Sequence, residues 1–147
     1  LRIGMGEAEM RDILTRAIAE VPNAVGMNNH TGSKFTQDAE ALGVFFPLLR
    51  ETSLFFVDSR TTGKSKAYEK ALEAGIRAGS SSLFLDNRGD PDAIVQQGRK
   101  LIGLAKSKGT AIGICHFRPT TAGVLGQIIQ EIRAAGVELV HVSELIP

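Results

Sequence analysis

The sequence predicts an α/β fold in which helices and strands alternate to form a mostly parallel, curved sheet of five strands. Apolar residues recur at helical spacing in five segments, and each segment is followed by a short apolar run. Continuous apolar runs are typical of strands covered on both faces, and strands separated by single helices form parallel, right-handed units. We find no linker, low-complexity segment or repeat, so we expect residues 1–147 to form a single domain.

The first two helix–strand units occupy the first 58 residues. Apolar positions within residues 10–21 recur at helix spacing, and Pro22 ends that helix. Residues 23–28 form a short apolar run that we expect to be a strand. A second helix is expected over residues 42–49, and the apolar run at 53–58 predicts the second strand.

The third unit combines a helix over residues 64–75 with a strand over 81–86. Gly75 stands where a helix commonly ends, because glycine adopts the left-handed conformation at little cost. Asp90 and Pro91 then mark a helix start, since an acidic N-cap followed by proline in the first turn is a strong initiation signal.

The last two strands complete the predicted sheet. Gly109 ends the fourth helix, and residues 110–115 form the fourth apolar run. Thr120 or Thr121 opens the final helix, and a last strand is expected over residues 137–142.

Composition excludes several classes of protein. The net charge is +1, the 17 basic residues are scattered, and tryptophan is absent, so the sequence gives no reason to expect a nucleic-acid or anionic-membrane partner. No apolar run approaches the roughly 20 residues that span a bilayer. A single cysteine, Cys115, excludes an internal disulfide and a cysteine-rich zinc module. We expect Cys115 to be buried and to point away from its strand neighbour His116.

Polar residues cluster where each of the first four predicted strands ends. The carboxyl ends of parallel strands meet on one face, which is where α/β sheets and barrels bind ligands. We therefore expect these residues to converge around one cavity. The clusters contain Asn28, Asn29, His30, Thr31, Gly32 and Ser33 after the first strand; Asp58, Ser59, Arg60, Thr61 and Thr62 after the second; Asp86, Asn87 and Arg88 after the third; and His116, Arg118 and Thr120 after the fourth.

Two histidines of these clusters, His30 and His116, are candidate zinc ligands. A catalytic zinc ion keeps about three protein ligands and a water, so a carboxylate such as Asp58 or Asp86 would have to complete the set. The same residues also fit a purely structural interpretation. Strand-end histidines often hydrogen-bond within their own loop, and aspartates at such positions form turns and helix caps.

A function without a metal ion is also possible from these residues: Arg60, Arg118 and helix N-termini could bind a small phosphorylated ligand. The Gly-Ser-Lys stretch at residues 32–34 counts against it, because a phosphate-binding loop requires lysine directly after the glycine. Both arginines could instead pair with the neighbouring aspartates.

Four segments, VGMNNHTGS, LFFVDSRTT, SLFLDN and AIGICHFRP, resemble in order and spacing the signature segments of the divergent polysaccharide deacetylase family. The resemblance runs from Leu1 to Pro147 and implies part of a distorted (β/α)7-type barrel. It also implies a hydrolase of carbohydrate metabolism that removes N- or O-acetyl groups from polysaccharides. In such enzymes an aspartate and two histidines hold a divalent ion, commonly zinc, which polarises the acetyl carbonyl and lowers the pKa of its water.

The resemblance assigns roles to individual residues, in catalysis, substrate binding and metal binding. His30 matches the metal-binding histidine, and the late His116 matches either a second ligand or the acid that protonates the leaving group. The matching segments place catalytic residues at Asp58, Arg60 and His116, substrate-binding residues at Asn29, Ser33, Asp86 and Arg118, and metal ligands at His30 and His116.

Two features depart from the family pattern. Family members carry an Asp-Asp segment on their first strand, and nothing in this chain matches it. The chain starts abruptly at Leu1, so we expect the first strands of the barrel to be missing and the metal site to be incomplete. The Cys-His-Phe-Arg-Pro run also differs from the commoner Gly-His-Pro form, which leaves the orientation of His116 open.

The missing strands have consequences for function and assembly. The first strand would have an exposed edge, which a second copy of the chain could cover. A non-catalytic member of the same fold, binding glycan or a partner protein, is therefore the alternative to an active deacetylase. The family resemblance implies an extracytoplasmic location, in the periplasm or outside the cell.

Overall fold

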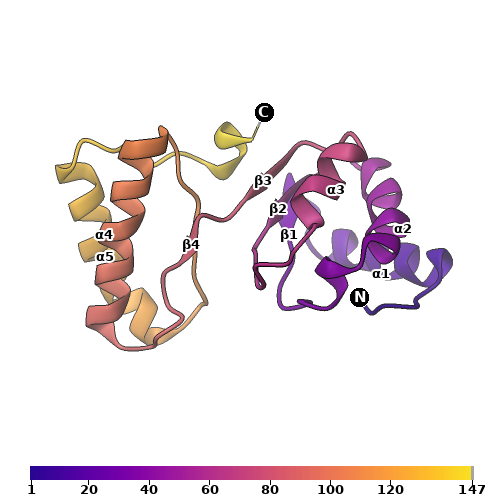
Figure 1. The fold of residues 1–147 in the computed structure, drawn as a ribbon, viewed down its shortest axis with the longest axis horizontal. Helices are drawn as coiled ribbons and strands as arrows, with labels where there is room; N and C mark the ends of the chain where they lie inside the picture. The colour runs from indigo at the N-terminus through magenta and orange to yellow at the C-terminus, as the bar shows by residue number, and fades with distance from the viewer. Residues whose placement is uncertain (147) are drawn as a thin grey trace. The chain divides into compact units, whose positions relative to one another are not determined.

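The computed structural model describes residues 1–146, which divide into two compact units. One unit holds residues 1–80 together with Ile146, and the other holds residues 81–145. Helices and parallel strands alternate along the chain in both (Figure 1), which confirms the α/β class. The single domain expected over residues 1–147 stays a prediction.

The first unit contains three helices, three strands and a 3-10 turn. Its sheet is wholly parallel with β2 in the middle, and Asn28 of β1 stands opposite Val57 of β2. The elements are α1 (Glu7–Glu20), β1 (Gly26–Asn28), η1 (Phe35–Gln37), α2 (Ala39–Arg50), β2 (Phe55–Asp58), α3 (Ala67–Glu73) and β3 (Ala78–Ser80).

Aromatic side chains form the centre of the first unit's core. Phe46 of α2 packs edge-on against Phe56 of the central strand, with ring centroids 5.2 Å apart, and Phe45 packs edge-on against Phe35 at 6.1 Å. Such edge-to-face pairs add to the stabilisation gained by burying apolar area. All four residues of β2 are buried, so the strand that ends in Asp58 is covered on both faces.

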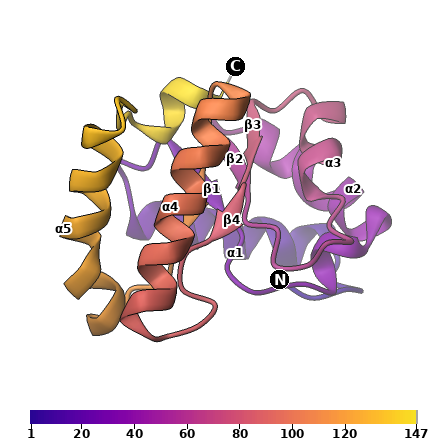
Figure 2. The ribbon, with the colours of Figure 1, turned by 60° about the vertical axis from the view of Figure 1, so that its left-hand side comes forward.

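The second unit pairs two short strands and packs two long helices side by side (Figure 2). The side chains of Ile94 on α4 and Ile128 on α5 lie in its core. On the outer surface Arg99 binds both carboxylate oxygens of Glu131, which lowers the pKa of Glu131 to about 2. The elements are β4 (Leu83–Phe84), α4 (Pro91–Lys108), β5 (Gly113–Ile114), α5 (Pro119–Ala134) and η2 (Val142–Leu145).

The helix signals at Gly75, Asp90 and Gly109 are confirmed, whereas the last helix begins at Pro119, before the expected Thr120 or Thr121. The side chain of Asp90 accepts a hydrogen bond from the Ala93 N–H, as an N-cap does, and Pro91 opens α4. Gly75 and Gly109 have φ of 74° and 85°, in the left-handed region that favours glycine.

The single five-stranded sheet is corrected by the structure, whose described strands form one sheet of three and another of two. The strand expected at 81–86 shrinks to Leu83–Phe84, and β3 forms earlier, at Ala78–Ser80, where it pairs with β2. Residues 78–80 pair with β2, whereas residues 83–84 pair with β5. The two segments therefore belong to different sheets. Closure of the strands into a barrel remains a prediction.

The strand predicted at 137–142 is wrong. No strand of the described chain pairs with this segment, and Leu139 and Val140 are exposed. The His141 N–H instead bonds the Glu144 side chain at the start of η2. A strand forms only where a neighbouring strand completes its backbone hydrogen bonds, and none of the described strands does so for this segment.

Two further expectations concern exposure to solvent and lipid. Cys115 was expected to be buried, but it is exposed just past β5, where the strand has already ended. Over residues 1–146, no helix combines the length and the apolar character needed to cross a bilayer.

Two glycines of α4 provide a matched test of the helix packing. A Cβ on Gly98 would lie 2.9 Å from Ile128 Cγ2, whereas a Cβ on Gly103 would meet no atom within 4 Å. Alanine gains up to about 1 kcal/mol of helix propensity over glycine, and overpacking costs about 1–3 kcal/mol. In urea unfolding followed by circular dichroism, we expect Gly103→Ala to raise the free energy of unfolding and Gly98→Ala to lower it by about 1 kcal/mol. An equal rise in both variants would contradict the close approach of α4 and α5.

Candidate functional site

The loops that follow β1 and β2 are joined by a network centred on Ser59. These loops are neighbours because β1 and β2 are adjacent parallel strands. The Ser59 N–H donates to Asn29 Oδ1 at 2.9 Å, and its hydroxyl donates to the Asn29 carbonyl at 2.6 Å. Asn28 Nδ2 donates to the same hydroxyl at 2.9 Å. The predicted substrate-binding residue Asn29 is therefore held by the loop of the next strand.

A second set of bonds connects the far ends of the same loops. Ser33 Oγ lies 3.1 Å from Thr61 Oγ1, which in turn donates to the Thr31 carbonyl at 3.3 Å. Gln37 Nε2 donates to the Ser33 carbonyl at 2.7 Å. Ser33 is thus fixed from both sides, by the loop after β2 and by η1.

Asp58 organises the turn that carries Arg60. Its side chain is only 1% exposed, Oδ1 accepts the Arg60 N–H at 2.8 Å, and Oδ2 accepts the Ser65 hydroxyl at 2.8 Å. Arg60 has φ of 48°, a left-handed conformation that is uncommon for a residue with a side chain. The structure thus gives Asp58 the turn-forming role that the sequence left open, and the guanidinium of Arg60 extends from an exposed position. The catalytic roles of both residues stay predictions.

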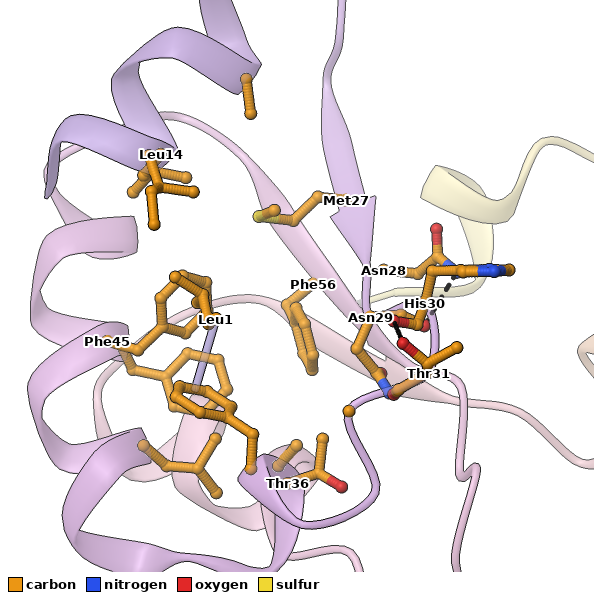
Figure 3. A pocket seen from close by; sticks show the side chains of 17 residues that line it. Leu1, Leu14, Met27, Asn28, Asn29, His30, Thr31, Thr36, Phe45 and Phe56 are labelled. Atoms are coloured by element: carbon orange, nitrogen blue, oxygen red, sulfur yellow. Dashed lines mark hydrogen bonds between the residues drawn. The ribbon is translucent and has the colours of Figure 1, made fainter. Parts of the chain in front are cut away.

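A cavity of about 220 Å³ opens beside the loop after β1. Figure 3 shows Met27, Phe45 and Phe56 among the apolar side chains that line it, with residues 28–31 along one edge. The ring of His30 is exposed and points away from these apolar side chains. The cavity can accept an apolar group, but His30 does not face into it.

In the second unit, Asp86 and His116 form a direct contact. The carboxylate of Asp86 is fully buried at the end of β4. Its Oδ1 lies 3.0 Å from His116 Nδ1, and its Oδ2 accepts the His116 backbone N–H at 2.9 Å and the Thr121 hydroxyl at 2.8 Å. One buried carboxylate therefore joins the ends of β4 and β5 to the first turn of α5.

The hydrogen bonds to Asp86 keep it ionised. Burial acts to raise the pKa of this carboxyl, but the bonds from the His116 ring, the His116 backbone and the Thr121 hydroxyl together outweigh burial. The pKa of Asp86 consequently lies below its ordinary value. The same negative charge adds to the effect of burial in raising the pKa of the Cys115 thiol, which disfavours its nucleophilic thiolate form.

The contact with Asp86 determines which nitrogen of His116 can exchange a proton. An ionised carboxylate only accepts hydrogen bonds, so Nδ1 must carry hydrogen. In the neutral ring Nε2 then carries the lone pair that can accept a proton. The ring of Phe84 stacks on His116 with centroids 6.0 Å apart and planes at 25°, which further restricts the orientation of the imidazole.

The side chain of Arg118 is anchored to the main-chain carbonyl of Asp86. Its Nη1 donates to the Asp86 carbonyl at 3.1 Å, and its own N–H bonds the His116 carbonyl at 3.0 Å. The expected pairing of Arg118 with the Asp86 carboxylate is not formed. Arg118 also occupies the N-cap of α5, where it makes no side-chain capping bond.

Neither unit, over its described residues, gathers three His, Cys, Asp or Glu side chains that could hold a metal ion. In the first unit, Asp58 uses both carboxylate oxygens for its turn. In the second, Asp86 is already bound to His116 and Thr121. The donor set within each unit therefore does not fit a three-ligand zinc centre, and zinc binding by His30 and His116 remains a prediction.

The predicted site residues fall into two groups, one in each unit. Their convergence on a common cavity stays a prediction. The sequence placed Ser59 in the predicted cluster without indicating its bonds to Asn29. It did not reveal Ser65 and Thr121 as hydrogen-bond donors to Asp58 and Asp86, because a hydroxyl group carries no spacing signal for its contacts. The first group is Asn29, His30, Ser33, Asp58 and Arg60, and the second is Asp86, His116 and Arg118.

Comparison with known proteins gives consistent results. A family model described as divergent polysaccharide deacetylase matches residues 1–146. An uncharacterized protein of Haemophilus influenzae is 40% identical over 125 residues, covering 85% of this chain and 45% of its own length. The uncharacterized protein YibQ of Escherichia coli is 34% identical over 146 residues, covering 99% of this chain and 46% of its own length.

A solved structure supports the fold. The crystal structure of an uncharacterized protein from Agrobacterium tumefaciens matches with a TM-score of 0.92 at 24% identity. The match covers 97% of this chain and 58% of that protein. The chain thus spans about half the length of the curated relatives that it matches.

The buried Asp86 carboxylate predicts a pH dependence of stability. Because its pKa in the folded chain lies below the unfolded value of about 4, it stabilises the fold above pH 4, and this contribution is lost as the pH falls through the folded pKa. An amide cannot accept all three bonds, so we expect Asp86→Asn to lower the free energy of unfolding at pH 7 by about 2–4 kcal/mol.

The test is urea unfolding of wild type and variant at pH 7 and pH 3, with the exposed Asp92→Asn as the matched control. The difference between wild type and Asp86→Asn should shrink at pH 3, whereas Asp92→Asn should stay close to wild type at both values. A difference that does not change with pH would contradict an ionised Asp86.

Proposed function

The chain belongs to the divergent polysaccharide deacetylase family, and from this we propose that it is part of a hydrolase that removes acetyl groups from carbohydrate. The observation that supports this chemistry is the contact of His116 with the buried Asp86 carboxylate. A histidine whose Nδ1 is held by a carboxylate can move a proton at Nε2, which acetyl transfer to water requires.

In the proposed reaction His116 handles the proton of hydrolysis. Water adds to the acetyl carbon, the bond from that carbon to the sugar nitrogen or oxygen breaks, and acetate leaves. As the water adds, Nε2 of His116 takes a proton from it, and Nε2 then returns that proton to the departing amine or alcohol. Asp86 holds the ring in one tautomer, and Phe84 restricts its tilt.

The first unit supplies the proposed sugar-binding groups. Asn29 and Ser33 present polar side chains on loops that are already fixed by hydrogen bonds, so little freedom is lost when a sugar binds. Arg60 offers a cationic group from its turn, and Asp58 acts on the reaction by positioning Arg60. Arg118 contributes to the rim around His116.

The sequence resemblance implies that a divalent ion takes part in the chemistry of this family. It also implies that His30 and His116 would be ligands of that ion. The three-ligand set is not met by the side chains of either unit over the described residues. We therefore derive no step through a metal ion for this chain. That observation favours a second candidate function, a glycan-binding member of the fold without catalysis.

The remaining proposals concern partners and location. The carbohydrate is the proposed ligand, and the family suggests an extracytoplasmic compartment. β1 pairs with β2 on one side only, so we propose that a second copy of the chain can cover its other edge.

Loss of the imidazole should slow hydrolysis strongly. General acid–base catalysis contributes about 10²–10⁴-fold, so we expect His116→Gln to reduce acetate release from N-acetylated chitotetraose or O-acetylated xylotetraose by that factor. Cys115→Ser, an adjacent and exposed change, is the control and should retain the wild-type rate. Undiminished acetate release by His116→Gln would exclude the proposed role of His116. Binding of these sugars without any acetate release, in wild type and variant alike, would support the glycan-binding alternative.

Metal content separates the two candidate functions further. Because neither unit completes a three-ligand set, we expect elemental analysis of the purified chain to find zinc well below one ion per molecule. His30→Ala should leave that value unchanged. Stoichiometric zinc that disappears in His30→Ala would instead establish a metal centre and favour the catalytic function.

A further inference from the structure

Phe117 occupies an unusual position beside the Asp86–His116 contact. Its ring is fully exposed to solvent, the most exposed large apolar side chain among the described residues. Phe117 is the middle residue of a three-residue turn that the Arg118 N–H closes by bonding the His116 carbonyl at 3.0 Å. The side chain therefore projects from the apex of a hydrogen-bonded turn.

Both neighbours of Phe117 are anchored on Asp86. His116 is held through its backbone N–H and its ring, and Arg118 is held through Nη1 on the Asp86 carbonyl. Pro119 follows as the first residue of α5, where its fixed φ limits the chain further. The turn that exposes the ring is thus anchored on both sides by Asp86, through its carboxylate at His116 and through its main-chain carbonyl at Arg118.

The surroundings of Phe117 indicate what kind of ligand its ring would meet. The exposed neighbours Arg118 and Thr120 place hydrogen-bonding side chains close to Phe117 in the chain. An aromatic ring flanked by hydrogen-bonding groups suits a pyranose, which has an apolar C–H face and polar hydroxyls around its rim.

We propose that Phe117 is a stacking platform for a sugar ring of the carbohydrate substrate and holds that sugar next to His116. This inference rests on the proposed function and adds to it a positioning residue that acts by binding. The stacking contact would be made equally in the ground state and in the transition state, so it should affect KM and leave kcat nearly unchanged.

The test compares wild type with Phe117→Ala and Phe117→Tyr. Binding of N-acetylated chitotetraose and O-acetylated xylotetraose is measured by titration calorimetry, and acetate release is followed over a range of sugar concentrations. We expect Phe117→Ala to weaken binding and raise KM by about 10-fold, with kcat changed less than about twofold. Phe117→Tyr keeps the aromatic ring and should stay within about twofold of wild type. Because Phe117 is exposed, urea unfolding should show all three proteins equally stable.

Each outcome decides one of the two ideas. Weaker binding by Phe117→Ala without acetate release from any protein would support the platform and overturn the proposed hydrolysis. Acetate release with the same KM in Phe117→Ala and wild type would overturn the platform and support the hydrolysis. Absence of binding to either sugar in wild type would overturn the platform, as would an equal loss of affinity in Phe117→Tyr.

Discussion

The hydrogen bonds of the buried Asp86 carboxylate are the constraint on which the second unit depends. β4 and β5 contain only two residues each, so backbone pairing alone holds their ends weakly. Asp86 adds bonds to the His116 main chain, the His116 ring and the Thr121 hydroxyl. A fully buried charge is stable only when it is satisfied in this way. The hydrogen bonds that stabilise the buried carboxylate therefore also fix the chain after β5, the imidazole of His116 and the first turn of α5.

The first unit reaches a comparable order by different means. Its loops are joined mainly by uncharged groups, with Ser59 connecting Asn29 to the end of β2. Its buried aspartate, Asp58, is used locally, to close the turn that carries Arg60. The two units therefore contribute different chemistry. One unit holds hydrogen-bonded polar side chains on its loops, and the other holds a histidine oriented by a buried carboxylate.

Local signals were reliable wherever the relevant physics is local. The N-cap at Asp90 and the left-handed glycine at 109 depend on a few neighbouring residues, and both are found as expected. The apolar run at 137–142 was misleading because a strand depends on a partner elsewhere in the chain, and here no described strand pairs with it. The residues 81–86 were misleading for a related reason, since the pairing partner changes from β2 to β5 between Ser80 and Leu83.

The sequence by itself determined the α/β class, the helix ends marked by Gly75, Asp90 and Gly109, and the position of Asp58 at the end of a strand. These follow from the period of apolar residues and from the side-chain chemistry of caps and glycines, which act over a few residues. Only the tertiary structure decided that Asp86 binds His116 and Thr121, whereas Asp58 bonds the turn of Arg60. The two aspartates look alike in sequence, because the donors that a buried carboxylate meets are set by chain segments far away.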